Sequence, residues 1–519
     1  MNYGNLNIGL FLKQSSHRYP EKEALVTEKG RFTYREFDGQ VNQLCNGLLD
    51  MGIKKGDRVA FLFYNEWEAL ASYFAITRIG AVVVPINYRL VKDEMLYQLN
   101  HSESRAFIFD PTFGSQVQDM MKDAPKIENY LCSEGKGPAG NCQSLDELFL
   151  RYPTHDPKLR WKVREQDPSG ILYTSGTTGR PKGAVITHYS AIWSAVTFAL
   201  ENQFAAGMRF LECVPLFHRA GLEDLALPVI MVGGTILLLR TFDAMRVLKT
   251  IEKEKATHAF IVPTMSYAVL QELEAHPGKY DVSRLDGYLT GTAPWPGETM
   301  RRLRAHFPAT TRQANLFGIT EALFITAARQ EELDRKGATA GKPVIGAQMK
   351  ILDDRLQEAP PGVVGEIVVK EPQQMKGYWK NPQATKEVTW KDGWYRSGDL
   401  GYVDEEGYLY ILDRKKDMII SGSENVYSVE VENVLVTHPQ VAEAGVIGTP
   451  DEKWGEVVTA CVVLKPGQKA EAREVIEFCD GRMASYKKPK RVFFVESLPK
   501  SPTGKIQKVK LREQFKNSR

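Results

Sequence analysis

Residues 174–183, with the sequence TSGTTGRPKG, constrain this chain more than any other segment. The groups suited to phosphate are hydroxyls, glycine backbones and one lysine, contributed by Thr174, Ser175, Gly176, Thr177, Thr178, Gly179 and Lys182. Glycines let backbone N–H groups approach an anion, hydroxyls donate to phosphate oxygens, and the lysine supplies positive charge. The strand-like run at 171–173 argues against a flexible linker. The segment therefore predicts a loop that binds a polyphosphate.

This loop differs from the Walker A loop, which reads GxxxxGK followed by Ser or Thr. Here Arg180 and Pro181 separate Gly179 from Lys182. An ordinary P-loop NTPase is therefore not expected.

The length and charge of the chain bound its class. A chain of 519 residues with 43% apolar residues exceeds the size of most single cores, so at least two domains are expected. A formal net charge of +3 disfavours a nucleic-acid partner, because such binding needs a strongly basic face. The basic tail at 505–519 is interpreted as a solvated chain end.

Cysteine spacing and apolar stretches indicate the compartment. The six cysteines lie far apart without a CxxC pair, which fits a reducing compartment and indicates neither a disulfide framework nor a zinc site. The first residues do not resemble a secretory signal, and the most apolar stretch, 225–239, is too short to span a bilayer. We expect a cytoplasmic protein without a transmembrane segment, and we interpret 225–239 as a buried helix followed by a buried strand.

Alternating periodicities predict an α/β fold. Thr33 is placed to cap a helix, and the strand-like runs at 58–63, 81–87 and 106–110 are separated by helical patterns near 66–78 and 91–101. Such repetition is typical of βαβ units in a parallel sheet covered on both faces. The last hundred residues have the pattern of a small α+β domain, and the charged run 413–417 joins it to the rest.

Further motifs follow the loop in a fixed order. They are PLFHRAG (215–221), GTAP (291–294), NLFGITE (315–321), GEIVVK (365–370), MKGYWKNPQAT (375–385), YRSGDLG (395–401), DRKKDMIISGSENVYSVEVE (413–432) and PKSPTGKI (499–506). Together they resemble the adenylate-forming superfamily of acyl-CoA synthetases, adenylation domains of peptide synthetases and luciferases. The resemblance covers nearly the whole chain. It implies a large N-terminal domain, 1–413, and a small mobile C-terminal domain, 414–519, with the hinge at Lys416.

The resemblance also implies the reaction. A carboxylate and ATP would give an acyl-adenylate and pyrophosphate, after which the thiol of coenzyme A would displace AMP. The loop would hold the β- and γ-phosphates, Thr320 would donate to the α-phosphate, and Glu321 would hold Mg²⁺. Lys505 would be the catalytic lysine, bridging the carboxylate and the α-phosphate.

Nucleotide contacts are implied at several motifs. Asp399 would accept the ribose hydroxyls, with Arg414 supporting the ribose and phosphate side. The adenine would lie between an aromatic ring and the backbone of the GTAP motif, with contributions from Gly291, Thr292, Ala293, Pro294, Asn315 and Phe317. Relatives usually have tyrosine where this chain has Phe317, so stacking is retained but any role of the hydroxyl is lost.

The second half-reaction and the acyl pocket involve other residues. Ser421 and Gly422 would line the channel for the pantetheine arm, and His218 would lie between the carboxylate site and this channel. Relatives that use acetate have tryptophan at the position of Gly318, so the glycine predicts a pocket for more than two carbons. Glu223, Asp224 and Trp295 are unusual nearby residues that either shape this pocket or pack away from it.

The resulting hypothesis is an AMP-forming acyl-CoA ligase for a medium-chain, cyclic or aromatic acid. One alternative is an acyl-AMP ligase that loads a carrier protein in trans, and another is a nucleotide-binding regulator without turnover. The presence of Lys182, Glu321, Asp399 and Lys505 together speaks against the regulator. The acid, the physiological direction and the oligomeric state, a homodimer being one alternative, are left open.

Overall fold

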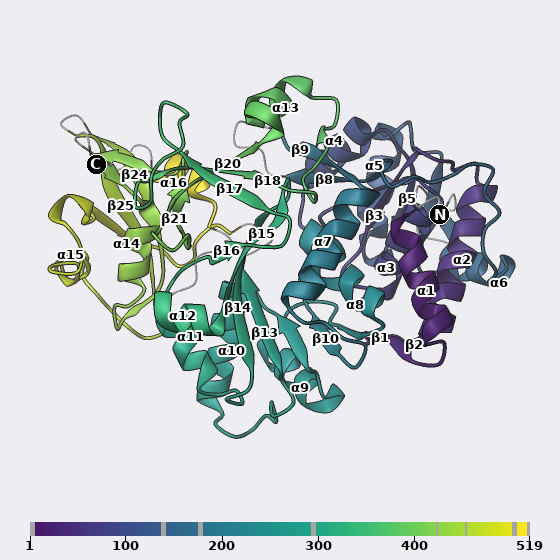
Figure 1. The fold of residues 1–519 in the computed structure, drawn as a ribbon, viewed down its shortest axis with the longest axis horizontal. Coiled ribbons are helices and arrows are strands. Elements are labelled where there is room, and N and C mark those ends of the chain that lie inside the picture. The colour runs from purple at the N-terminus through teal and green to yellow at the C-terminus, as the bar shows by residue number, and fades with distance from the viewer. Residues whose placement is uncertain are drawn as a thin grey trace.

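The computed structural model describes residues 6–135, 142–174, 180–291, 297–421, 424–451, 454–500 and 506–515. Two large sheets form most of the right and lower parts of Figure 1, a small antiparallel sheet lies near the centre, and a five-stranded sheet lies at the left, beside the carboxyl end. None of the helices in the described part of the chain is long and apolar enough to cross a membrane.

The eight-stranded sheet has the order β19-β9-β8-β4-β3-β5-β6-β7. Strand β3 (Arg58–Leu62) pairs in parallel with β4 (Val82–Pro85) and β5 (Ser104–Phe109), and helices α3 (Trp67–Arg78) and α4 (Lys92–Ser102) make the crossovers. The other strands are β6 (Asn129–Cys132), β7 (Gln143–Ser144), β8 (Pro168–Thr174), β9 (Lys182–Thr187) and β19 (Gly377–Tyr378). The predicted βαβ repetition is confirmed.

Local sequence signals place the first helices. Helix α2 (Tyr34–Asp50) begins after Thr33, whose hydroxyl accepts from the backbone N–H of Glu36 while the Glu36 carboxylate accepts from the Thr33 N–H. This capping box satisfies two backbone N–H donors that a helix end would leave free. The predicted cap at Thr33 is confirmed.

The nine-stranded sheet has the order β16-β15-β14-β13-β12-β10-β11-β1-β2. Its strands are β1 (Glu23–Thr27), β2 (Gly30–Thr33), β10 (Arg209–Glu212), β11 (Thr235–Leu238), β12 (His258–Phe260), β13 (Gly287–Gly291), β14 (Arg312–Ile319), β15 (Leu323–Arg329) and β16 (Lys342–Pro343). The six strands from β1 to β14 in this order run parallel. Their carboxyl ends therefore lie at one edge, the usual place for ligands in such sheets.

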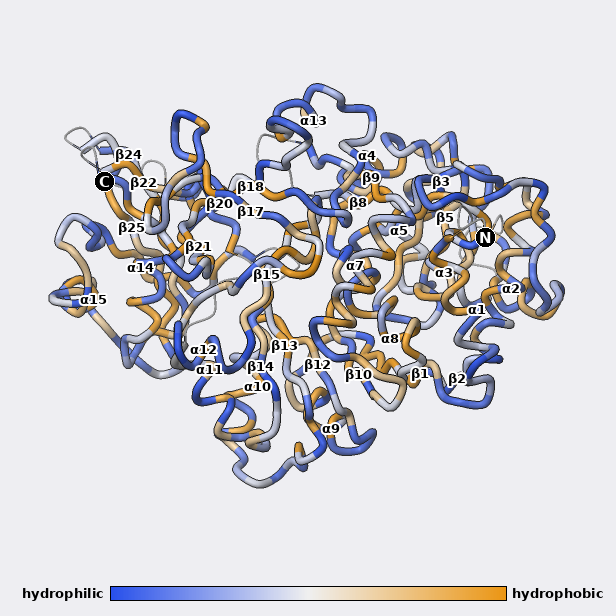
Figure 2. The backbone as a smooth tube through the Cα atoms, in the orientation of Figure 1, coloured by the Kyte–Doolittle hydropathy of each residue, from blue (hydrophilic) through white to orange (hydrophobic). Residues whose placement is uncertain are grey.

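Helices fill the space between the two large sheets (Figure 1). They include α1 (Ile8–Arg18), α7 (His188–Glu201), the π-helical turn η3 (Ala220–Ala226) and α8 (Leu227–Val232). The largest apolar cluster contains residues of these helices and of both sheets, and the apolar segments of Figure 2 gather there. The helix and strand expected within 225–239 are confirmed as α8 and β11, separated by Gly233 in a left-handed conformation at φ 76°.

The carboxyl-terminal third forms two smaller sheets. Strands β17 (Gln348–Leu352), β18 (Gly365–Lys370), β20 (Tyr395–Val403) and β21 (Leu409–Arg414) make an antiparallel sheet. The last sheet contains β22 (Ile419–Ser421), β23 (Glu424–Val426), β24 (Val441–Asp451), β25 (Gly455–Leu464) and β26 (Arg491–Phe494). Helices α14 (Ser428–Leu435), α15 (Ala472–Phe478) and α16 (Lys508–Phe515) accompany it. The predicted small α+β domain is confirmed, and its boundary at 413 stays a prediction.

Candidate active site

The predicted phosphate loop closes a β-hairpin. Strands β8 and β9 are antiparallel, with Thr174 opposite Lys182 and Tyr173 opposite Gly183. The Thr174 hydroxyl donates to the Lys182 carbonyl at 3.4 Å. Ser175, Gly176, Thr177, Thr178 and Gly179 lie outside the described residues. Because a strand follows the loop, a phosphate there would be held by loop groups and Lys182 and not by the N-terminus of a helix.

A tyrosine connects the loop lysine to the predicted metal ligand. The Lys182 ammonium lies 5.3 Å from the centre of the Tyr378 ring, and the Tyr378 hydroxyl donates to Glu321 Oε1 at 2.7 Å. Strand β19 places Tyr378 opposite Ala184 of β9. The Glu321 carbonyl accepts from Met375 N at 2.7 Å, which fixes the backbone as well. Sequence reasoning missed Tyr378, although it stands in the MKGYWKNPQAT motif.

The predicted ribose site is an ion pair across two strands. Asp399 of β20 lies opposite Arg414 of β21, and Arg414 Nε is 3.0 Å from Asp399 Oδ1. The pKa of Arg414 is raised, first by the Asp399 carboxylate, against the effect of burial, and further by Glu321. Asp399, Arg414 and Glu321 therefore share one electrostatic environment. Tyr395 of β20 lies beside Tyr378, with 3.5 Å between the two hydroxyl oxygens.

The predicted adenine segments lie on neighbouring strands. Gly291 ends β13 opposite Leu316 of β14, and Asn315 lies opposite Thr290. The Asn315 amide donates to the Thr339 carbonyl at 3.0 Å. Phe317 is half-buried on the same strand. Thr292, Ala293, Pro294 and Trp295 lie outside the described residues.

The close approach of two strands explains the glycine at residue 318. A Cβ atom at this residue would lie 1.6 Å from the Leu323 carbonyl oxygen, because β14 and β15 approach closely beside an irregularity in their register. The missing side chain would therefore point into the backbone of β15. This geometry counts against the interpretation that Gly318 leaves room for the acyl group, because a tryptophan here would have to displace a strand before it could fill any pocket.

A buried arginine ties the His218 segment to the Thr320 segment. Arg219 donates to the carbonyls of Thr320 at 2.8 Å and Gln373 at 2.9 Å, and its Nε binds Glu223 at 2.6 Å. Asp224 accepts from the Ser194 hydroxyl at 2.6 Å. Glu223 and Asp224 are both buried. The two acids thus belong to a buried polar network. This favours the alternative that they pack away from the acyl pocket over the one that they shape it.

The remaining predicted residues lie toward the small domain. Lys416 is exposed in a tight turn in which Asp417 N donates to the Arg414 carbonyl at 2.8 Å. Ser421 is buried at the end of β22, opposite Glu424. Gly422 and Lys505 lie outside the described residues, and Lys500 and Ile506, on either side of Lys505, form a β-bridge.

The donor set fits a metal that arrives with a nucleotide. Within the described residues no group of three or more His, Cys, Asp or Glu side chains could hold a metal ion. Mg²⁺ is often bound by one or two carboxylates together with substrate phosphates. Glu321, held by Tyr378 near Lys182, supplies one such carboxylate.

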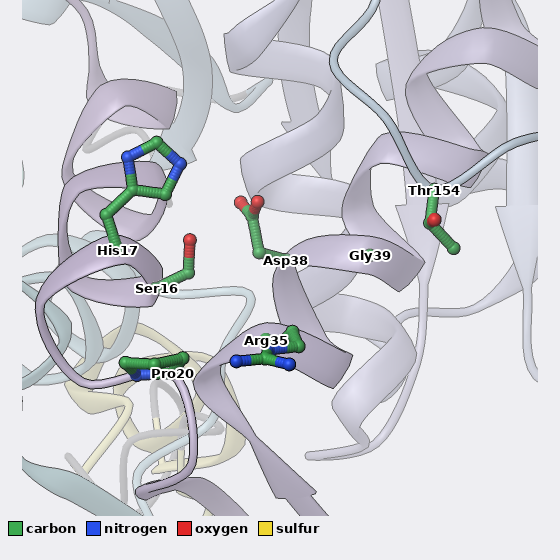
Figure 3. Close-up of a pocket in the computed structure, with 7 residues that line it drawn as sticks. All are labelled: Ser16, His17, Pro20, Arg35, Asp38, Gly39 and Thr154. Carbon is green, nitrogen blue, oxygen red and sulfur yellow. The ribbon is translucent and has the colours of Figure 1, made fainter.

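A separate surface pocket of about 410 Å³ lies between α1 and α2 (Figure 3). It is lined by Ser16, His17, Pro20, Arg35, Asp38, Gly39 and Thr154. Asp38 is already paired with Arg78 at 2.6 Å. Its lining contains none of the predicted site residues.

Comparison with known proteins identifies the family of the chain. The AMP-binding enzyme family matches residues 12–379, and the AMP-binding enzyme C-terminal domain matches 430–505. Feruloyl-CoA synthase from an Amycolatopsis species is 37% identical, with 98% of this chain and 99% of the relative covered. Indoleacetate–CoA ligase from Aromatoleum aromaticum is 35% identical, with 97% and 96% covered.

A solved structure agrees over the same length. The anthranilate CoA ligase AuaEII in complex with anthranoyl-AMP has a TM-score of 0.90 and 28% identity, with 99% of this chain and 98% of that one covered. The chain therefore belongs to the AMP-binding enzyme family and is an AMP-forming acid–thiol ligase.

Proposed function

We propose that the protein converts an aromatic or arylalkyl carboxylic acid, ATP and CoA into the acyl-CoA, AMP and pyrophosphate. The observation that carries the proposal is the convergence of Lys182, Glu321, Asp399 and Arg414 around Tyr378. These groups combine cations for phosphates with carboxylates for a metal ion and for ribose hydroxyls.

In the first half-reaction a carboxylate oxygen attacks the α-phosphorus and pyrophosphate leaves. Both reactants are anionic, so positioning and positive charge are the main contributions a protein can make. Lys182 would hold the leaving phosphates and Lys505 would bridge the reacting groups. Glu321 would hold Mg²⁺, which when bound screens the charge of the pyrophosphate.

In the second half-reaction the CoA thiol attacks the acyl carbon, and AMP leaves with the carboxylate oxygen. Rotation of residues 414–519 about Lys416 would withdraw Lys505 and bring Ser421 and Gly422 to the adenylate. The exposure of Lys416 in its turn supports this role. Gly422 would allow a close approach of the pantetheine arm.

The aromatic character of the acid rests on two observations. The three proteins compared above are named for ferulate, indoleacetate and anthranilate, all of which contain an aromatic ring. The His218 ring also lies 4.4 Å from that of Phe217, which meets Tyr88 edge to face at 5.1 Å. Such a wall suits edge-to-face or offset contacts with an aryl group. We further propose a cytoplasmic location, because the wide spacing of the six cysteines fits a reducing compartment.

A panel of acids tests this proposal. The sharpest pair is 3-phenylpropanoate and nonanoate, because both have nine carbons and only one has a ring. AMP release should depend on CoA and favour the phenyl acid. A preference for nonanoate would contradict the aromatic assignment. AMP release that requires a carrier protein and ignores CoA would favour the carrier-loading alternative, and no AMP release with any acid would contradict catalysis.

A further inference from the structure

A buried carboxylate crosses the predicted domain boundary. Asp413, the last residue of the predicted large domain, accepts from the backbone N–H of Ser428 at 2.6 Å and from the Ser428 hydroxyl through the same oxygen, Oδ2. Its other oxygen accepts from Arg414 N at 2.8 Å. Asp413 is 4% exposed and Ser428 is fully buried. This contact is therefore removed from water, where a charged hydrogen bond is stronger than at the surface.

Asp413 supplies a cap that helix α14 lacks. Ser428 is the first residue of α14, and Tyr427 at its N-cap position makes no side-chain capping bond. A helix N-terminus has unpaired N–H groups and a partial positive charge, so a carboxylate there is favourable. Here the carboxylate comes from β21, on the other side of Lys416.

The same serine reaches the segment that carries Lys505. Lys508, the first residue of α16 and three residues after Lys505, donates to the Ser428 hydroxyl and lies 2.8 Å from Glu432. Glu432 in turn accepts from Val446 N at 2.8 Å. The pKa of Lys508 is raised because the Glu432 and Asp413 carboxylates outweigh its burial.

Asp413 precedes the proposed hinge residue Lys416, and the other members of this polar cluster follow it. Asp413 is held in β21 opposite Leu400 of β20. Ser428, Glu432 and Lys508 all follow Lys416 and are bonded to one another or to β24. Rotation about Lys416 would therefore open the cluster at Asp413 alone and leave the rest intact.

We propose that Asp413 is an interdomain latch and a positioning residue for the first half-reaction. It caps α14 and, through Ser428 and Lys508, holds the start of α16, three residues beyond Lys505, against α14. This inference rests on the proposed function for the roles of Lys505 and Lys416. The latch closes for adenylate formation and opens for thioester formation.

The test compares Asp413→Asn and Asp413→Ala with a matched control, Asp392→Asn. Asp392 is an exposed aspartate in a left-handed turn, φ 54°, that asparagine tolerates. Loss of a cap changes an equilibrium by about fivefold or more, so pyrophosphate release should slow by that factor in Asp413→Ala. Thioester formation from supplied acyl-adenylate should stay at the wild-type rate or rise. Equal slowing of both half-reactions would overturn the latch.

Lys508 provides a second set of variants. Lys508→Arg keeps the charge and should keep the wild-type ratio of the rate of pyrophosphate release to the rate of thioester formation. Lys508→Met should lower this ratio, and combining it with Asp413→Asn should lower it no further, because both changes break one chain of contacts. Additive effects in the double variant would show that Asp413 does not act through Lys508.

A distance measurement separates failure of the latch from failure of the proposed function. All six native cysteines are buried, so spin labels can be attached selectively at Lys249→Cys in α9 (Ala244–Glu254) and Arg473→Cys in α15, both exposed. Asp413→Ala should move the population toward a second interdomain distance. If wild type and variant show the same distribution, the latch is overturned, whether or not the protein forms an adenylate with any acid.

Discussion

The nucleotide side of the large domain and the contact with the small domain are held together in different ways. Asp399 and Arg414 are fixed opposite each other on paired strands, and Tyr378 binds Glu321 within the same region. The two main apolar clusters of the small domain, by contrast, contain only residues from 419 onward, whereas the largest cluster of the chain has no residue beyond 411. The contacts described at the boundary are polar ones, at Asp413.

This difference fits the proposed rotation, in which the nucleotide side would stay fixed and the contacts at the boundary would change. A shared apolar core would resist rotation, because moving it exposes buried area to water. Directional polar contacts can be exchanged for others with little net cost. We therefore expect substitutions on the nucleotide side to affect both half-reactions and those near the boundary to separate them.

The largest effect is expected at Lys505. Lys505→Ala should slow pyrophosphate release by about two to three orders of magnitude, because in the proposed mechanism its charge is needed only while the α-phosphate is attacked. Thioester formation from supplied acyl-adenylate should remain. Single-turnover assays of each half-reaction measure the two rates, with Lys510→Ala on α16 as the matched loss of an exposed lysine. Pyrophosphate release at the wild-type rate in Lys505→Ala would contradict the proposed role of Lys505.

Tyr378→Phe should have the next largest effect, on the fixed side. Removing the hydroxyl that holds Glu321 should lower the apparent affinity for Mg²⁺ by about 10- to 100-fold, as for other groups that orient a metal ligand. Activity against Mg²⁺ concentration and direct Mn²⁺ binding with ATP measure this. Tyr410→Phe also loses one hydrogen bond, to the Lys336 carbonyl, and should leave the metal affinity unchanged. Equal affinities in all three proteins would refute a positioning role for Tyr378.

Gly318→Ala should reduce stability and not alter the choice of acid. Its Cβ would collide with the Leu323 carbonyl, and such overpacking costs about 1–3 kcal/mol of unfolding free energy. Denaturant unfolding measures the loss, with Gly207→Ala as the control because open space surrounds that glycine. A stable variant with a changed preference among acids would show that Gly318 does face the acyl group.

The smallest effect is expected at Asp224, as a change in pH dependence. Burial raises the pKa of Asp224 to about 7, whereas an unfolded aspartate titrates near 4. Between these values the folded state keeps a proton that the unfolded state releases. Asp224 therefore lowers stability as pH rises through this window, by at most about 1.4 kcal/mol per pH unit. Asp224→Asn still accepts from Ser194 and should flatten that slope in unfolding measured from pH 4 to 7. An unchanged slope would contradict the assignment.

Much of the fold was predictable because its signals are local. Apolar runs such as 58–62 and the cap at Thr33 specify strands and helices through neighbouring residues. The close approach at Gly318 and the bond from Tyr378 to Glu321 join segments that the sequence separates, so periodicity contains no signal for them.

The charged run at 413–417 shows the same limit. As a pattern it indicates an exposed turn, and Lys416 is exposed. Asp413 and Asp417 are nevertheless buried, because Ser428 and Arg512 reach them from much later in the chain. The burial of these two aspartates could be learned only from the folded structure.

Isotope transfer from the acid to AMP shows whether this site makes an acyl-adenylate. The acid is supplied with both carboxylate oxygens as ¹⁸O, together with ATP and CoA, and the products are analysed by mass spectrometry. If the carboxylate attacks the α-phosphorus, each AMP carries one ¹⁸O and the pyrophosphate carries none. Unlabelled AMP, or label in pyrophosphate or phosphate, would contradict acyl-adenylate formation.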